Sequence, residues 1–155
     1  MRIQKTALVV VYALFTIYLM WLPFRPTQAR TVEFLNDSCI RPQKYYSYTT
    51  CHPINVKIDG FYVEVPANFD TDLASIPRWY WSILSPAYTS FIAPSILHDY
   101  LYTCTSPYTR KQIDEIFYYA LLSKGVSRYT AVKMYTAVRV FGGRHYKKIH
   151  LCLKN

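Results

Sequence analysis

The stretch 94–102 reads PSILHDYLY and the stretch 110–122 reads RKQIDEIFYYALL, and together they decide how this chain folds. Both have apolar residues at helical spacing, and a proline-containing segment separates them, so they predict two consecutive helices. In the first helix His98 and Tyr102 share a face, while Asp99 is turned about 100° from His98. Asp99 is therefore a candidate ligand for a cation.

The second stretch has an acidic residue on its apolar stripe. Asp114 is spaced with Phe117 and Leu121 on the face that should meet the core. A carboxylate there is unfavourable without a partner. In an antiparallel hairpin, with its turn at 105–107, Asp114 reaches His98. A carboxylate fixes the tautomer of the imidazole and raises its basicity, as a general base requires; the alternative is a buried polar pair that only sets helix register.

Local sequence signals mark the ends of these two helices. Pro94 fits the first position of the first helix, which is expected to run to about Cys104. Pro107 and Thr109 start the second helix, and Gly125 lies just past its end.

Further helical segments flank this pair. Ser127 caps a third helix, which the glycines at 142–143 stop, and a short aromatic helix is expected at 76–84. Arg139 lies on one face of the third helix and is expected to pair with a buried carboxylate such as Asp72, in a stabilising role.

A β-hairpin precedes the helices. Residues 55–59 and 61–65 alternate apolar and polar side chains around Asp59-Gly60, a two-residue turn that needs positive φ at both positions. A shorter strand is expected at 45–49. We therefore predict an α+β fold: an N-terminal transmembrane or signal helix, a small hairpin, and a three-to-four-helix unit.

The first 29 residues have the pattern of an export signal. Arg2 and Lys5 precede an uncharged apolar run at 7–22, which Pro23 ends. The run is either the core of a secretory signal or, at close to the ~20 residues that span a bilayer, an anchor. Residues 27–29, Thr-Gln-Ala, form a weak cleavage site. We predict a signal peptide or signal anchor at 1–29 and one exported domain at 30–155, on the periplasmic face of a bacterial inner membrane or free in the periplasm.

The four cysteines agree with export. Cys39, Cys51, Cys104 and Cys152 all follow the apolar run, and an even number outside the cytosol indicates disulfides. Three pairings are open. Their spacings match no common zinc pattern.

The charge balance points to an acidic partner. The chain has a net charge of +9, of which Arg2, Lys5 and Arg25 supply three, leaving +6 for the remainder. A basic exported domain suits membrane lipid or another anionic envelope surface better than nucleic acid. Sixteen tyrosines and three tryptophans add amphipathic side chains for such an interface. The oligomeric state is open.

The stretches 98–102 (HDYLY) and 113–117 (IDEIF) together resemble the His-Asp and Asp helix signature of compact phospholipases A2. The resemblance implies an antiparallel helix pair in which His98 deprotonates the attacking water, Asp114 orients His98, and Tyr102 supports the network. It implies that Asp99 binds calcium. The glycine-rich calcium loop of that family is not visible in this sequence.

Calcium takes six to eight oxygen ligands, more than one carboxylate provides. The nearest additional candidates are Asp70 and Asp72, two apart in an expected loop. An Asx-turn leading into the 76–84 helix is the alternative for these two.

A second resemblance covers 65–142. The motifs VP at 65–66, TDLASIP at 71–77, HDYLY at 98–102 and MYTAVRVFG at 134–142 are similar to a phage and prophage family, domain of unknown function number 1353. This resemblance implies a small protein of phage or bacterial origin and assigns no activity.

Three functions fit these residues. The first is a calcium-dependent, exported hydrolase of lipid esters that acts at a bilayer. The alternative is a non-catalytic phage or prophage envelope protein, for superinfection exclusion or as a lysis accessory, with the His98–Asp114 pair as structure. A metal phosphohydrolase using His98-Asp99 would need an upstream histidine, and the candidate, His52, lies in an expected loop.

Overall fold

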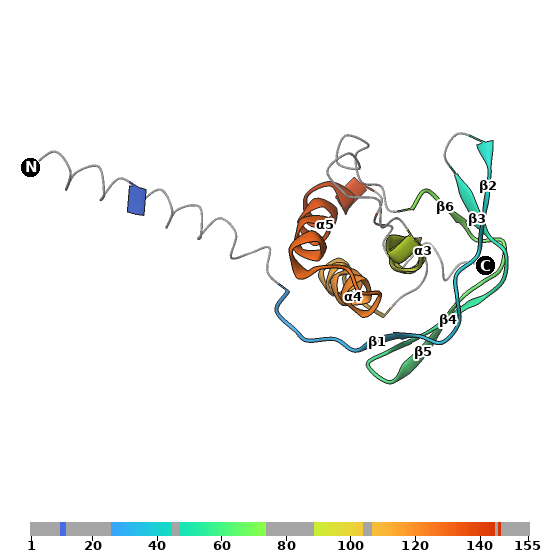
Figure 1. The fold of residues 1–155 in the computed structure, drawn as a ribbon, viewed down its shortest axis with the longest axis horizontal. Coiled ribbons are helices and arrows are strands. Elements are labelled where there is room, and N and C mark those ends of the chain that lie inside the picture. The colour runs from blue at the N-terminus through green and yellow to red at the C-terminus, as the bar shows by residue number, and fades with distance from the viewer. Residues whose placement is uncertain are drawn as a thin grey trace, which may run out of the picture.

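A computed structural model of the chain describes residues 10–11, 26–44, 47–73, 89–103, 107–144 and 146. Strands come first and helices follow, which confirms the α+β class. Figure 1 shows the strands as a curved layer around one side of the helices. The helical elements are α3 (Thr89–Thr103), α4 (Arg110–Ser123), α5 (Arg128–Phe141) and the 3-10 helix η3 (Gly142–Arg144).

The strands form two small antiparallel sheets. The first has the order β1-β4-β5, with β1 (Val32–Phe34), β4 (Ile54–Ile58) and β5 (Phe61–Val65). The second has the order β2-β3-β6, with β2 (Ile40–Pro42), β3 (Tyr48–Thr50) and β6 (Asp70–Thr71). A disulfide between Cys39 and Cys51 joins the residue before β2 to the residue after β3. It is one of the pairings that the sequence allows; Cys104 and Cys152 lie outside the described residues.

The predicted hairpin is confirmed as β4 and β5. Asp59 and Gly60 have φ angles of +51° and +90°, and Ile58 pairs with Phe61 across the turn. Glycine and aspartate reach these angles more readily than bulkier residues, so this turn sets the register of the two strands. Residues alternate between buried and half-buried along β4, which gives the sheet one face toward the helices.

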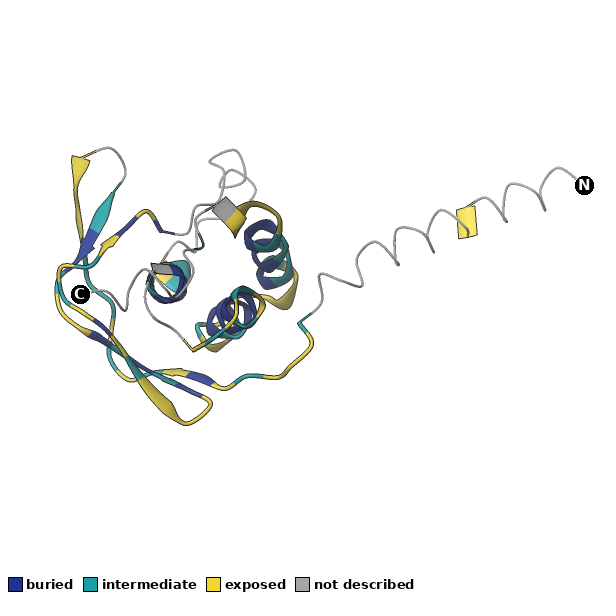
Figure 2. Cartoon of the chain, turned by 180° about the vertical axis from the view of Figure 1, so that it is seen from behind, coloured by how far each residue is buried: buried dark blue, intermediate teal, exposed yellow. Residues whose placement is uncertain are grey.

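Helix α4 lies between two clusters of buried side chains. One cluster joins the first sheet to α3 and α4, and the other joins α4 to α5. Figure 2 shows the helix faces that turn toward each other as buried. Eight of the fourteen residues of α4 are buried, where the sequence predicted a single apolar stripe. This double burial places two acidic neighbours, Asp114 and Glu115, in the interior.

The predicted helix ends are confirmed for α4 and α5. Thr109 and Gln112 form a reciprocal capping box at the start of α4, and Gly125 follows the helix at a φ of +79°. The Ser127 hydroxyl accepts a hydrogen bond from the Thr130 N–H at the start of α5, and Gly142 ends that helix.

The predicted start of α3 is wrong. The helix begins at Thr89, and Pro94 lies inside it instead of at its first position. Proline removes one backbone hydrogen bond there, which disfavours the helix. Burial of Ala93 and partial burial of Phe91 and Ile92, in the turn before Pro94, offset that loss.

Among the described residues, no helix is both long enough and apolar enough to span a bilayer. Of the segment 1–29, the structure describes residues 10–11 and 26–29. The short helix expected at 76–84 lies outside the described residues. The described residues form three α-helices of the expected three-to-four-helix unit.

Candidate functional site

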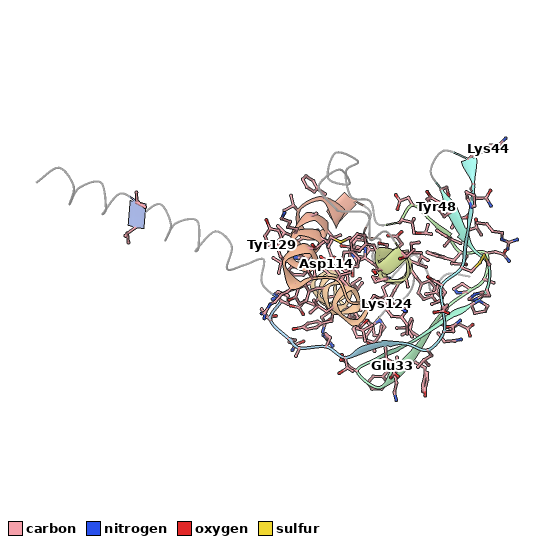
Figure 3. The ribbon with its side chains drawn as sticks, in the orientation of Figure 1. Glu33, Lys44, Tyr48, Asp114, Lys124 and Tyr129 are labelled. Carbon is pink, nitrogen blue, oxygen red and sulfur yellow. A yellow bond between two sulfur atoms is a disulfide. The ribbon has the colours of Figure 1, made fainter. Side chains whose placement is uncertain are left out.

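Helices α3 and α4 run antiparallel and bring His98 and Asp114 together. Tyr102, near the end of α3, contacts Arg110 at the start of α4, whereas His98 packs against Phe117 further along α4. The Nε2 atom of His98 lies 3.0 Å from Oδ1 of Asp114, as the sequence predicted. Both side chains are buried, at 3% and 0% exposure. Figure 3 shows Asp114 among the three helices.

Both oxygens of the Asp114 carboxylate are occupied. The Tyr102 hydroxyl donates to Oδ1 at 2.5 Å, beside the His98 bond, and Nη1 of Arg139 donates to Oδ2 at 2.8 Å. Nε of Arg110 lies 3.9 Å from Oδ2. Such a set of donors and positive charges is what a fully buried carboxylate needs to remain ionised.

Arg139 pairs with a buried carboxylate, as the sequence predicts. That carboxylate is Asp114, whereas the residue suggested from the sequence is Asp72. The reason is the packing of α5 along α4, which brings the last turn of α5 to the site. Arg110 strengthens this junction, because its Nη2 donates to the carbonyls of Val138 and Arg139 at 3.0 and 2.6 Å. These carbonyls end α5, where positive charge is favourable.

The electrostatics of the pair favour its charged form. Burial opposes ionisation of Asp114, but the hydrogen bond and charge of His98, with the Tyr102 and Arg139 bonds, hold the pKa of Asp114 below its ordinary value. Burial also opposes protonation of His98, yet Asp114 and then Asp99 outweigh it and raise the pKa of His98. Burial and the Asp114 charge raise the pKa of Tyr102, so its hydroxyl stays a donor.

The second nitrogen of His98 has a different environment. Nδ1 is buried and has no hydrogen-bond partner among the described residues. Oδ1 of Asp99 is the nearby charge, at 3.8 Å. Because an ionised Asp114 accepts the proton on Nε2, a neutral His98 has its lone pair on Nδ1. The site therefore presents a positioned imidazole base whose basic nitrogen adjoins a second carboxylate.

Asp99 is engaged by the second sheet. The Thr71 hydroxyl donates to Oδ2 of Asp99 at 2.5 Å, and Thr71 is itself buried on β6. The same Thr71 oxygen accepts the N–H of Leu73, whose φ is +61°. The contact between Thr71 and Asp99 was not foreseen, because no local pattern links residues that lie in different elements and far apart in sequence.

Asp70, Asp72 and Asp99, the three predicted metal ligands, do not form one metal-binding group in the described part of the chain. Asp70 is exposed and its Oδ1 accepts the Thr49 hydroxyl at 2.8 Å, on the second sheet. Asp72 follows β6 and is exposed. The part of the chain that the structure describes contains no group of three or more His, Cys, Asp or Glu side chains suited to a metal ion. These residues alone therefore do not fit the oxygen shell that calcium requires.

Gly142 closes the site on the side of Tyr102. A Cβ at Gly142 would lie 2.9 Å from the Tyr102 hydroxyl, closer than a side-chain atom can approach. At Gly143 a Cβ would meet the Arg110 guanidinium at 3.1 Å. The sequence marked these glycines only as a helix stop; their second role is to let α5 end directly against Tyr102 and Arg110.

The fold and the site define a class: a small α+β domain in which a buried His–Asp pair, supported by a tyrosine and an arginine, joins antiparallel helices. The family model described as "Protein of unknown function (DUF1353)" matches residues 49–138, more than half of the chain. The chain belongs to this family, as its motifs had indicated. The match includes His98, Asp99, Tyr102 and Asp114.

One curated protein is similar to part of the chain. The "Uncharacterized protein y4jT" of Sinorhizobium fredii (strain NBRC 101917 / NGR234) is 34% identical over 85 residues. The matched stretch is 54% of this chain and 25% of that relative, so the chain spans about a quarter of the relative's length. No solved structure matches the chain significantly.

Proposed function

We propose that this domain hydrolyses carboxylic esters of membrane lipids, with His98 as the general base. The observation that supports the proposal is the asymmetry of the imidazole. Nε2 is bound to the ionised Asp114, while Nδ1 has no partner among the described residues and adjoins Asp99. A base that activates water needs one nitrogen held and the other available.

The proposed reaction is a direct attack by water. A water molecule gives one proton to Nδ1 of His98 while its oxygen bonds to the ester carbonyl carbon. The tetrahedral intermediate then expels the alcohol oxygen, which takes the proton back from Nδ1. Asp114 stabilises the transient imidazolium through Nε2, and Tyr102 and Arg139 keep Asp114 in place.

Lipid is the proposed substrate for three reasons. The stretches 98–102 and 113–117 resemble a phospholipase A2 signature, the remainder of the chain after residue 29 has a charge of +6, and the apolar run at 7–22 is expected to bring the domain to a bilayer. His98 is 3% exposed, so substrate must approach from the side of Asp99, whose side chain is 14% exposed.

The test is release of fatty acid from mixed vesicles of anionic and zwitterionic phospholipid by the full chain, with calcium and with a chelator. The two arms are needed because the phospholipase resemblance implies a calcium ligand at Asp99. The key variant is His98→Gln, since a glutamine amide places a donor near the Nε2 position and lacks a basic nitrogen. Loss of ester release in this folded variant is expected; release equal to that of the wild type would exclude His98 as the base.

A second candidate is a non-catalytic envelope protein of a phage or prophage. The observation that favours it is the complete burial of Asp114 with both oxygens hydrogen-bonded, because such networks also fix helix register in structural proteins. This function predicts that His98→Gln keeps the biological effect, measured as exclusion of a superinfecting phage or as timing of lysis. The ester hydrolase predicts that the same variant loses it.

A further inference from the structure

Glu115, the neighbour of Asp114 on α4, is a buried acid that the proposed reaction does not use. It is 1% exposed. Its Oε1 accepts hydrogen bonds from the backbone N–H of Thr27 at 3.0 Å and from the Thr27 hydroxyl at 2.8 Å. A carboxylate at this depth requires donors, and two of them come from a segment that the sequence assigns to the export signal.

Thr27 begins an N-terminal strap, residues 27–34, that follows the surface of the domain. Figure 1 shows this strap running beneath α4 into β1. Nη1 of Arg30 donates to Oδ2 of Asp59 at 2.6 Å, and the N–H of Thr31 donates to Oδ1 of Asp59 at 2.9 Å. The backbone N–H of Asp59 donates to the carbonyl of Thr31, and β1 pairs with β4. The strap is thus held to α4 at one end and to the first sheet at the other.

A cut after Ala29 would remove Thr27 and leave Glu115 without these two donors. Loss of the partner of a buried charged group is one of the most destabilising changes in a folded domain. We infer that the mature chain keeps Thr27 and is not cut after Ala29, the cleavage site that the sequence indicates, so that the apolar run at 7–22 is retained as an anchor. The inference does not depend on the proposed ester hydrolysis.

Retention places the domain close to the bilayer. Thr27 lies five positions after residue 22, and an extended chain covers at most about 3.6 Å per residue. Thr27, which is hydrogen-bonded to α4 through Glu115, therefore lies within roughly 18 Å of the end of the apolar run. A retained anchor therefore keeps the domain close to the lipid surface through a short covalent connection.

The first test is the N-terminus of the mature chain. The full-length protein is expressed in a bacterium with a working export pathway, and its intact mass is measured in the membrane and soluble fractions. We expect a chain that retains 7–22 and is found in the membrane fraction. A mature chain that begins at Arg30, or at any other position after residue 22, would overturn the inference.

The second test addresses the strap itself in the full-length protein in detergent. Thr27→Val removes the hydroxyl donor, and Thr31→Val is the matched control, because Thr31 is exposed on the same strap and contributes only its backbone groups there. Hydrogen exchange of the amides in 27–34 is expected to be roughly tenfold faster in Thr27→Val than in Thr31→Val. Equal exchange in the two variants would show that Glu115 does not hold the strap.

Discussion

His98 and Asp114 lie 3.0 Å apart, atom Nε2 to atom Oδ1, and both are buried at the contact between α3 and α4. The pair links two helices with two titratable groups whose charges depend on each other. Variants of the pair are expected to change the free energy of unfolding. Their effect on ester release tests His98 as the proposed base.

Removing the charge of Asp114 should destabilise the domain strongly. Asp114→Asn leaves the Arg139 guanidinium and the His98 N–H facing a neutral amide, and we expect a loss of about 3 kcal/mol in the free energy of unfolding. Urea unfolding of the full chain in detergent measures it. Asp70→Asn is the control, because Asp70 is exposed, and we expect it to change stability by no more than about 0.5 kcal/mol. Similar losses in the two variants would contradict the role assigned to Asp114.

The stability of the domain should fall as pH rises above neutrality. The pKa of His98 is raised in the folded state, so its contribution is fully present below the unfolded-state pKa of about 6.5 and is lost as pH rises through the folded pKa. The pKa of Asp114 is lowered, so its contribution is present above an unfolded-state pKa of about 3.9 and is lost as pH falls through the folded pKa. Urea unfolding of the wild type, measured at about pH 6, 7, 8 and 9, should show the loss of stability that comes from His98.

The His98→Gln variant supplies the comparison for this pH dependence. Glutamine does not titrate, so the decline in the free energy of unfolding above neutrality should be absent in the variant. If wild type and variant decline in parallel, the effect belongs to another group.

Ester release should depend on pH in the opposite direction to stability. The base must be neutral, and its pKa is raised by Asp114 and Asp99, so the rate should increase with pH through an apparent pKa above the ordinary histidine value of about 6.5. Initial rates on vesicles across that range measure it. A rate that is constant from pH 6 to about 9 would exclude this base.

Gly142→Ala should disturb the Tyr102 end of the site. Gly142 has an ordinary helical φ of −68°, so alanine introduces no backbone strain, but its Cβ would lie 2.9 Å from the Tyr102 hydroxyl. We expect a loss of about 1–3 kcal/mol in the free energy of unfolding. Gly143→Ala, where the nearest atom is the Arg110 guanidinium at 3.1 Å, should lose less, because the end of an arginine side chain can move. The opposite order would show that Tyr102 is not tightly packed.

The Cys39–Cys51 disulfide should stabilise the second sheet. It closes a loop with a sequence separation of 12. In the chain-entropy view a loop of this size contributes about 3 kcal/mol. Unfolding of the double variant Cys39→Ser, Cys51→Ser should show that loss relative to the oxidised wild type, and the reduced wild type should match the variant. Unchanged stability would mean that the strands order without the crosslink.

The elements predicted correctly are those whose signals lie within a few residues. The Asp59-Gly60 turn needs positive φ, and Thr109 and Ser127 cap helices through groups three residues away. The helix pair was predictable because Asp114 sits on an apolar stripe, and a buried carboxylate requires a partner. The start of α3 was predicted wrongly because Pro94 is a strong local signal for the first position of a helix. Packing of the turn before Pro94 makes the helix begin earlier, at Thr89.

By itself, the sequence determined that the chain makes a hairpin and a helix pair, and that His98 and Asp114 meet. Only the tertiary structure decided which other groups join them. Arg139 reaches Asp114 because α5 packs along α4, and Thr71 reaches Asp99 because β6 lies against α3. Periodicity assigns a residue to a face of its own element, whereas the partner on that face depends on how the elements pack against one another.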